Sequence, residues 1–268
     1  MKTTKTIFTI ISLTFLLASC EDIIDVELDS IKPRIVIEGV INDMDKQCQI
    51  KLSKTSDYFK PGELPVVTGA SVTVINDHGI ATEFEESAPG TFTSQCLKGT
   101  ENASYTLQVW AEEESYMANC TLPQKVHIDS LSFDIPPLLF DIQDGLMVTC
   151  YFQDPGDVRN YYRMKAYKKG DELAGDQSKF IFNDDFMDGN VMIMPWELNS
   201  FHPMDTVVVE LQNLDQATYD YYRTLFPILG GGFGASNPAN PETNISNDAL
   251  GYFGAYTICR DTVVILPI

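Results

Sequence analysis

The chain has few basic residues for its size. Its 268 residues include 18 Lys and Arg against 38 Asp and Glu, which gives a formal net charge of −20. A surface with this charge repels phosphate backbones and anionic head groups, so we expect no nucleic-acid partner and no docking flat on an acidic bilayer. The excess of carboxylates mainly keeps the protein soluble.

Catalytic motifs are also missing. The sequence has no G-x-S-x-G, no H-E-x-x-H and no Gly-rich phosphate loop that follows a strand and opens a helix. The three histidines, His78, His127 and His202, are widely spaced. Because catalysis needs a nucleophile or an acid–base pair held together, we expect a protein that is not an enzyme. A triad assembled across the fold is the alternative.

Long apolar runs and paired cysteine motifs are scarce. After residue 20 the longest apolar runs, such as 263–268, are strand-sized and far below the roughly 20 residues of a spanning helix. None of the six cysteines forms a C-x-x-C pair. With Cys20 set aside below, five remain, and an odd number leaves at least one thiol free. We expect buried thiols, with Cys96 and Cys120 as the first pair to test for a disulfide.

The N-terminus has the build of an export signal. Lys2 and Lys5 precede an uncharged apolar stretch at residues 7–18, which is too short to span a bilayer comfortably. The segment then ends in Leu17-Ala18-Ser19-Cys20, which resembles the lipobox of bacterial lipoproteins. This resemblance implies a signal peptide at 1–19 and acyl chains, including palmitate, on Cys20. A secretory signal with an incidental cysteine is the alternative.

An acidic tether is predicted at residues 20–33. Five of the positions from 21 to 29 are Asp or Glu, and apolar residues separate them. Acidic residues beside the lipidated cysteine resemble the surface-export signal of lipoproteins in the Bacteroidetes phylum. We therefore expect a lipid-anchored protein of the cell outer membrane, exposed at the cell surface. A tether that is merely solvated is the alternative interpretation.

Residues 34–123 show short runs with alternating apolar and polar residues, separated by turn residues. A period of two predicts half-buried antiparallel strands. Seven such strands at this spacing predict an N-terminal immunoglobulin-like β-sandwich. The predicted strands are Ile35–Ile41, Cys48–Ser53, Ser71–Asn76, Ala81–Glu85, Thr91–Gln95, Tyr105–Ala111 and Tyr116–Leu122.

Residues 124–268 predict a second β-rich sandwich domain that carries one α-helix. The helix is expected at 216–226, where Asp215 can cap its first turn and apolar residues recur at helical spacing. The protein as a whole is therefore expected to be mainly β. The strands predicted here are Val126–Phe133, Gly145–Phe152, Tyr161–Tyr167, Lys179–Phe182, Asn190–Met194, Thr206–Leu214 and Tyr256–Leu266.

A long segment rich in Gly, Asn and Pro follows the helix, and we interpret residues 229–254 as a loop. A loop of this length is usually functional, because closing it costs entropy that packing must offset. It is therefore the predicted surface for docking a partner. The candidate residues in it are Gly230, Gly231, Gly232, Phe233, Asn237, Asn244, Gly251, Tyr252 and Phe253.

Two acidic turns are candidates for binding a cation. Asp184, Asp185 and Asp188 lie around a glycine turn and are weak candidates for calcium, and 154–157 is a second acidic turn. Both more closely resemble turn-forming aspartates, so no cofactor is the first expectation.

For a sugar ligand, Trp196 is the better of the two tryptophans as a stacking platform, with Tyr256 behind it. Trp110 lies mid-strand, and the sequence does not decide which face of the strand it occupies.

The order of motifs resembles the DUF4249 lipoproteins of Bacteroidetes, a family named for a domain of unknown function. The motifs that carry the resemblance are the lipobox with its acidic residues, Ile35-Val36-Ile37-Glu38-Gly39, Val67-Thr68-Gly69-Ala70-Ser71-Val72, Asp154-Pro155-Gly156, Asn160-Tyr161-Tyr162-Arg163, and Asn244-Ile245 with Leu250-Gly251-Tyr252-Phe253-Gly254-Ala255. One departure is that no glycine stands between Asn244 and Leu250.

The resemblance implies an accessory lipoprotein that accompanies a TonB-dependent outer-membrane receptor. We therefore expect a non-catalytic component of a nutrient-uptake or surface complex. A surface glycan-binding β-sandwich module is the alternative.

Overall fold

The computed structural model describes residues 32–44, 48–56, 65–95, 97–134, 147–168, 171–172, 180–197, 203–229 and 240–266. All of these except Lys32 belong to one compact unit, Pro33–Ile268. The side chains of residues 134, 171, 172, 196 and 197 are outside the description.

The first seven predicted strands are present within one or two residues of their expected bounds, except that β4 runs three residues further. Their inward side chains alternate with exposed ones, as in β6, where Tyr105, Leu107 and Val109 are buried. The strands are β1 Ile35–Asn42, β2 Cys48–Lys54, β3 Ser71–Asn76, β4 Ala81–Ala88, β5 Thr91–Ser94, β6 Ser104–Ala111 and β7 Glu114–Thr121. β4 pairs with both β5 and β3 and so joins the two layers of a β-sandwich.

The second half is also β-rich, and it holds the one helix among the described residues. The elements are β8 Ile128–Asp134, β9 Met147–Gln153, β10 Tyr161–Lys168, β11 Asp171–Glu172, β12 Ile181–Asn183, β13 Val191–Glu197, β14 Thr206–Leu214, α2 Gln216–Leu229 and β15 Leu250–Val264. A three-stranded sheet, β13-β9-β8, packs over β10 and β14 around a second core. The prediction of a mainly β protein with sandwich architecture is confirmed.

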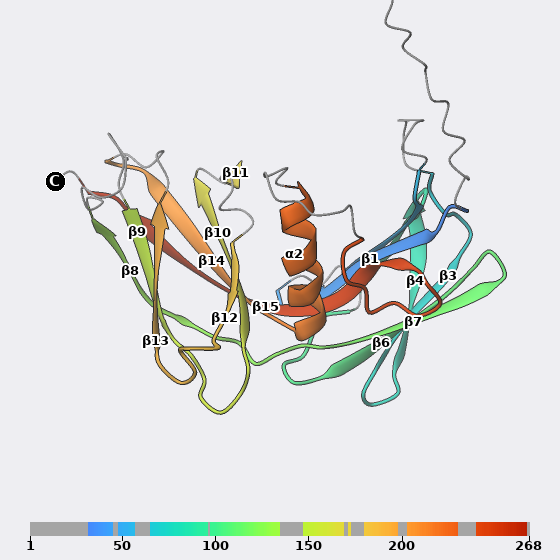
Figure 1. The fold of residues 1–268 in the computed structure, drawn as a ribbon, viewed down its shortest axis with the longest axis horizontal. Helices are drawn as coiled ribbons and strands as arrows, with labels where there is room; N and C mark the ends of the chain where they lie inside the picture. Colours follow the sequence, from blue (N-terminus) through green and yellow to red (C-terminus); the bar gives the residue numbers. More distant parts are fainter. Residues whose placement is uncertain are drawn as a thin grey trace, which may run out of the picture. The chain divides into compact units, whose positions relative to one another are not determined.

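Strand β15 connects the two halves (Figure 1). Its first part pairs in parallel with β1, from Val36 opposite Leu250 to Asn42 opposite Tyr256. Its second part pairs antiparallel with β14, beginning where Leu214 lies opposite Tyr256. One main sheet therefore runs through both halves in the order β11-β10-β14-β15-β1-β2-β5-β4-β3-β6-β7.

The predicted boundary between residues 123 and 124 does not separate the two cores. Ile245, Ala249, Phe253 and Ala255 are buried in the first core, although they come late in the chain. The last strand also begins six residues before its predicted start. The sequence pattern concealed this because residues 250–255 are buried on both faces and do not alternate.

A buried ion pair fixes the junction of the halves. Asp43 accepts a hydrogen bond from the backbone N–H of Ile258 at 2.9 Å, and the Lys125 ammonium lies 2.5 Å from its other carboxylate oxygen. Asp43 is buried, so removing Lys125 would leave its carboxylate without a counter-charge and shielded from water.

The helix begins where it was predicted to begin. The Asp215 carboxylate accepts a hydrogen bond from the Thr218 N–H at 3.0 Å, which is the geometry of an N-cap. The helix continues to Leu229, three residues past the predicted end, and Pro227 lies within its last turn. Gly254 of β15 lies so close that a Cβ there would be 1.8 Å from the Thr218 hydroxyl.

Candidate functional site

The predicted docking loop is in part a buried strand, and that part of the prediction is wrong. Gly251, Tyr252 and Phe253 are buried in the part of β15 that pairs with β1. Their backbone groups belong to the main sheet, so a partner cannot reach them without unfolding it. Five other candidates, Gly230, Gly231, Gly232, Phe233 and Asn237, are outside the described residues.

Asn244 is half-buried and holds neighbouring strands together. Its amide donates to the Phe253 carbonyl at 2.7 Å and to the Asn119 carbonyl at 3.0 Å, and its oxygen accepts the Phe253 N–H at 3.0 Å. These three hydrogen bonds use both the amide nitrogen and the amide oxygen of the side chain. Its role in the described fold is therefore structural.

The predicted stacking residues lie on strands of different sheets. Trp196 belongs to β13, where it is opposite Val148, and its side chain is outside the description. Tyr256 is half-buried where β15 passes from β1 to β14. Trp110 is the tryptophan that the structure describes in full, and it is 56% exposed on β6. The sequence could not show this, because the alternation along a strand does not say which of its two faces is turned to solvent.

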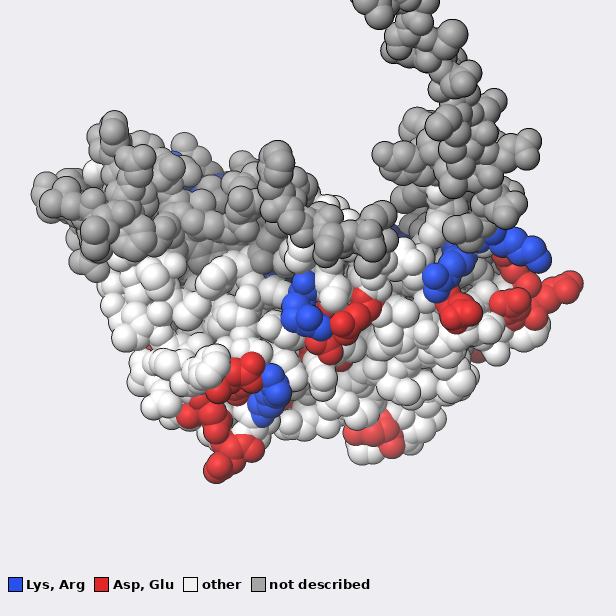
Figure 2. All heavy atoms as spheres, in the orientation of Figure 1, with Lys and Arg blue, Asp and Glu red and all other residues white. Residues whose placement is uncertain are grey.

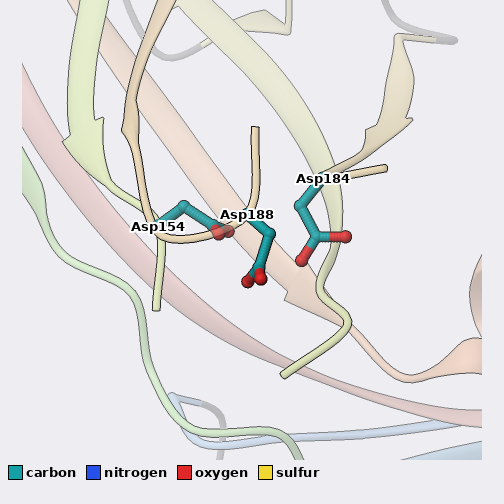
Figure 3. Close-up of side chains that lie close together, drawn as sticks. All are labelled: Asp154, Asp184 and Asp188. Carbon is teal, nitrogen blue, oxygen red and sulfur yellow. The ribbon is translucent and has the colours of Figure 1, made fainter. Parts of the chain in front are cut away.

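Two acidic turns meet at one end of the second sandwich. Residues 154–160 carry the chain from β9 to β10, and residues 184–190 carry it from β12 to β13, so both turns pass between the two sheets of the sandwich. We call these two segments together the crossover tip. It brings Asp154, Asp184 and Asp188 together, with one carboxylate oxygen of each within 4.8 Å of the others. Figure 3 shows the three side chains pointing toward one another.

Asp154 ties the two turns to the core. Its carboxylate accepts a hydrogen bond from the Tyr162 hydroxyl and another from the Gly189 N–H at 2.9 Å. Burial raises the pKa of Asp154 above its usual value, and the two hydrogen bonds oppose this shift. The neighbouring carboxylates of Asp184 and Asp188 raise the pKa further. Burial and the same bond place the pKa of Tyr162 well above its usual range, so the tyrosine remains a donor.

Asp184, on the turn 184–190, also links the two turns by hydrogen bonds. Its carboxylate accepts the Asn160 N–H at 2.7 Å, and its own N–H donates to the Asn160 carbonyl at 3.3 Å. The Asn160 amide in turn donates to the Val158 carbonyl at 2.8 Å. Both aspartates are buried, at 1% and 3% exposure, whereas Asp188 is exposed. Buried carboxylates bonded in this way stabilise turns without any ion.

The two glycines of the tip lie close to each other. A Cβ on Gly189 would lie 3.2 Å from the Gly156 Cα, and Gly189 has a φ of +69°. The Asp154 N–H also donates to the Asn190 carbonyl at 3.0 Å. The two turns are therefore packed backbone against backbone.

The predicted calcium ligands are only partly brought together. Asp184 and Asp188 belong to the group, but the Asp185 carboxylate lies 2.5 Å from the Arg159 guanidinium instead. Asp154, from the second acidic turn, takes its place. A bound calcium needs six to eight oxygen ligands, and here two of the three carboxylates already accept protein hydrogen bonds. The chain thus offers carboxylate oxygens to a hard cation but does not supply a full coordination shell.

A cleft of about 420 Å³ lies between the end of β7 and the start of α2. Its lining includes Asn119, Asp215, Asp220, Glu242 and Asn244. The Arg223 guanidinium lies 2.8 Å from Glu242 and 3.5 Å from Asp220, and so it pairs with both carboxylates and offsets part of their charge. The polar groups of the cleft are thus largely engaged with one another.

The thiols and histidines do not form a reactive group among the described residues. Cys48, Cys120, Cys150 and Cys259 are free cysteines, and Cys96 lies outside the description. Because Cys120 is a free buried thiol, the disulfide first considered for it is absent. Burial raises the pKa of Cys48 and of Cys150 to about 12. His78 is exposed in a turn.

Comparison with known proteins identifies the family. A family model described as a domain of unknown function, DUF4249, matches residues 21–261. The chain belongs to the DUF4249 family. No curated protein matches the sequence. The match covers nearly the whole chain after Cys20, so the two acidic turns, the helix and most of the connecting strand belong to the family region.

Two solved structures resemble the DUF4249 chain at low identity. One is the two fibronectin type-III domain segment from chicken tenascin, with 14% identity, 68% of this chain and 90% of that chain covered, and a TM-score of 0.23. The other is the Yersinia pseudotuberculosis adhesin InvE, with 13% identity, 67% and 55% covered, and a TM-score of 0.22.

Proposed function

We propose that this protein is a non-catalytic lipoprotein of the bacterial outer membrane, an accessory component of a TonB-dependent receptor in nutrient uptake or surface assembly. The observation that carries the proposal is the Leu17-Ala18-Ser19-Cys20 motif, directly after an uncharged apolar stretch and directly before acidic residues. Several acyl chains on Cys20 would hold the domain at a membrane, since each buried methylene contributes about 0.8 kcal/mol. Among the described residues, no helix is long and apolar enough to cross a membrane.

The state of the thiols and carboxylates supports a non-catalytic role. A cysteine nucleophile needs a lowered pKa, whereas burial raises the pKa of the Cys48, Cys120 and Cys150 thiols. The buried carboxylates Asp154 and Asp184 are engaged by backbone N–H and hydroxyl donors of neighbouring strands and turns. These groups are used to hold the fold together.

Two measurements test the proposal. The first is metabolic labelling with an alkyne fatty acid, in which the wild-type chain should carry label and move with outer-membrane fractions, and Cys20→Ser should do neither. The second is a mild-detergent pull-down through a C-terminal tag, in which a TonB-dependent receptor should be recovered. Recovery of the lipoprotein alone would count heavily against the receptor partnership, and an unlabelled wild-type chain would refute the lipid anchor.

A second candidate function is glycan binding, and one observation favours it. Trp110 is exposed on the outer face of β6, opposite Ser71 of β3 and Ser115 of β7. The next outward residue of β6, Gln108, is exposed beside it. An exposed indole beside hydroxyl and amide groups can stack on a sugar ring while its neighbours form hydrogen bonds.

Binding of the wild type, Trp110→Ala and Trp196→Ala to a glycan panel tests this candidate. If Trp110 is the platform, Trp110→Ala should lose binding and Trp196→Ala should retain it. The reverse pattern would support the predicted platform at Trp196. A wild-type chain that binds none of the glycans would refute the candidate.

A further inference from the structure

The crossover tip exposes apolar side chains to an unusual degree. Phe186 is 96% exposed, Val158 is 59% exposed and Met187 is 39% exposed. The first and third lie in the turn 184–190, and Val158 lies in the adjacent turn. Single exposed apolar residues are common on protein surfaces, but a group of large ones on adjoining turns marks an interaction site.

The tip is held rigidly, which suits binding. The Met187 N–H donates to the Asp184 carbonyl at 2.7 Å, and the Asn190 N–H donates to the Met187 carbonyl at 2.8 Å. The backbone of the turn that contains Phe186 is therefore held by hydrogen bonds. A partner that covers Phe186 loses little affinity to ordering the turn, since the turn is already ordered.

The apolar side chains are surrounded by negative charge. The two turns contain five aspartates and one arginine, and Asp157, Asp185 and Asp188 are exposed. The Arg159 guanidinium is paired with Asp185 and leaves the other exposed carboxylates without a cation in this group. Figure 2 shows the acidic side chains gathered at the lower left, where Figure 1 places these turns, with uncharged surface beside them.

The negative charge around the apolar side chains favours one class of binding partner for the crossover tip. A second copy of the chain, with its net charge of −20, would place the same acidic tip or another acidic surface against this one. An anionic bilayer would repel the aspartates as well. A protein surface with an apolar socket and a rim of Lys or Arg complements both the phenyl ring and its acidic border.

We propose that the crossover tip is the docking surface of this protein, and that its partner is a membrane protein whose apolar socket, rimmed by Lys or Arg, receives Phe186. The proposal rests on the proposed function, because it takes the receptor of that complex as the partner. It moves the docking surface from the predicted loop 229–254 to the turns 154–160 and 184–190.

Matched variants test the tip. The receptor that co-purifies with the wild-type lipoprotein serves as the probe, and Phe186→Ser is compared with Ile80→Ser. Ile80 is 61% exposed beside a turn of the first half, so both changes remove an exposed apolar side chain. Phe186→Ser should lower receptor recovery or affinity at least tenfold, as loss of a central aromatic does. Ile80→Ser should change it less than twofold, and both variants should keep the wild-type Tm.

A double variant tests the contribution of the acidic residues around the apolar side chains. Asp157 has a φ of +64°, which Asn tolerates, so Asp157→Asn with Asp188→Asn removes two charges without straining the turn. This double variant should weaken receptor binding at low salt and reduce its dependence on salt. An unchanged salt dependence would refute the basic rim.

Photo-crosslinking identifies the occupant directly. A benzophenone amino acid at position 186 of the full chain in native envelopes should give an adduct whose mapped peptide contains apolar residues flanked by Lys or Arg. An adduct to lipid, or to a second copy of this chain, would overturn the proposal. So would Phe186→Ser recovering the receptor with less than a tenfold loss, and in that case the proposed function would stand. A wild-type chain that recovers no receptor would overturn both.

Discussion

Asp215 offers the sharpest test of how this fold is held together. Its carboxylate accepts the Thr218 N–H at 3.0 Å and the Ala255 N–H at 3.2 Å, and a backbone hydrogen bond with Thr121 adds a third element. One side chain thus joins the start of α2, the strand β15 and the end of β7. Burial at this junction raises the pKa of Asp215 from 3.8 to about 6, and the hydrogen bonds oppose the shift only in part.

The raised pKa fixes the direction of a pH effect. Between pH 4 and pH 6 the unfolded chain has already released this proton, whereas the folded chain still holds it. The free energy of unfolding therefore falls as pH rises through this window and levels off above it. The difference between a pKa of 3.8 and one of about 6 corresponds to roughly 3 kcal/mol of unfolding free energy.

Asp215→Asn removes this titration while keeping the shape of the side chain. Urea unfolding followed by circular dichroism at pH 4, 5, 6 and 7 would give the free energy for both proteins. The difference, wild type minus variant, should fall by about 3 kcal/mol from pH 4 to pH 7. Other carboxyls such as Asp154 titrate in both proteins and cancel in this difference.

A second variant provides the control. Thr218→Val removes a hydroxyl donor to the carboxylate, which should raise the pKa of Asp215 further and move the fall in stability to higher pH. A difference between wild type and Asp215→Asn that is flat, or that rises with pH, would refute the reasoning. It would mean that the N–H donors outweigh desolvation at the junction.

Three other predictions concern single features of the fold. Gly251→Ala should destabilise the protein by at least about 4 kcal/mol in urea unfolding, because its Cβ would lie 2.0 Å from the Ile37 carbonyl oxygen at a φ of +90°; Gly69→Ala, at φ +69° with open space around it, should cost only about 1–2 kcal/mol. Cys48 and Cys150 should resist iodoacetamide at pH 8 until the chain is unfolded, as mass spectrometry of the alkylated peptides would show, and rapid native labelling would contradict their burial. Chelation with EDTA should leave the Tm unchanged, since the buried carboxylates of the crossover tip already accept protein hydrogen bonds, whereas a drop that calcium reverses would show a cation site there.

Local pattern predicted the strands and the helix well. The alternation around Ile35, Val72 and Leu107 requires one apolar face, and the structure buries these residues in one core. Asp215 before Thr218 predicted the start of the helix because capping is a contact between residues three apart. Features that depend on neighbours in the chain were therefore accessible from the sequence.

The grouping of the weak calcium candidates and the burial of part of the docking loop were not accessible from the sequence, because both depend on distant residues. Asp185 and Asp188 stand three residues apart, but the first pairs with Arg159 and the second faces Asp154. Gly251 and Phe253 follow a Gly- and Asn-rich stretch, which favours a loop, but pairing with β1 places them in the main sheet. A local sequence pattern does not show which distant strand a segment will pair with.

The sequence by itself determined the negative charge and the family, and it predicts an export signal and a lipobox at Cys20, because these depend only on composition or on short contiguous motifs. The tertiary structure alone decided that β15 joins the two halves, that two acidic turns meet, and that Phe186 and Trp110 face solvent. These outcomes depend on which strands pair and on which face each strand buries. A change of one residue in the register of β6, for example, would turn Trp110 to the opposite face of its strand.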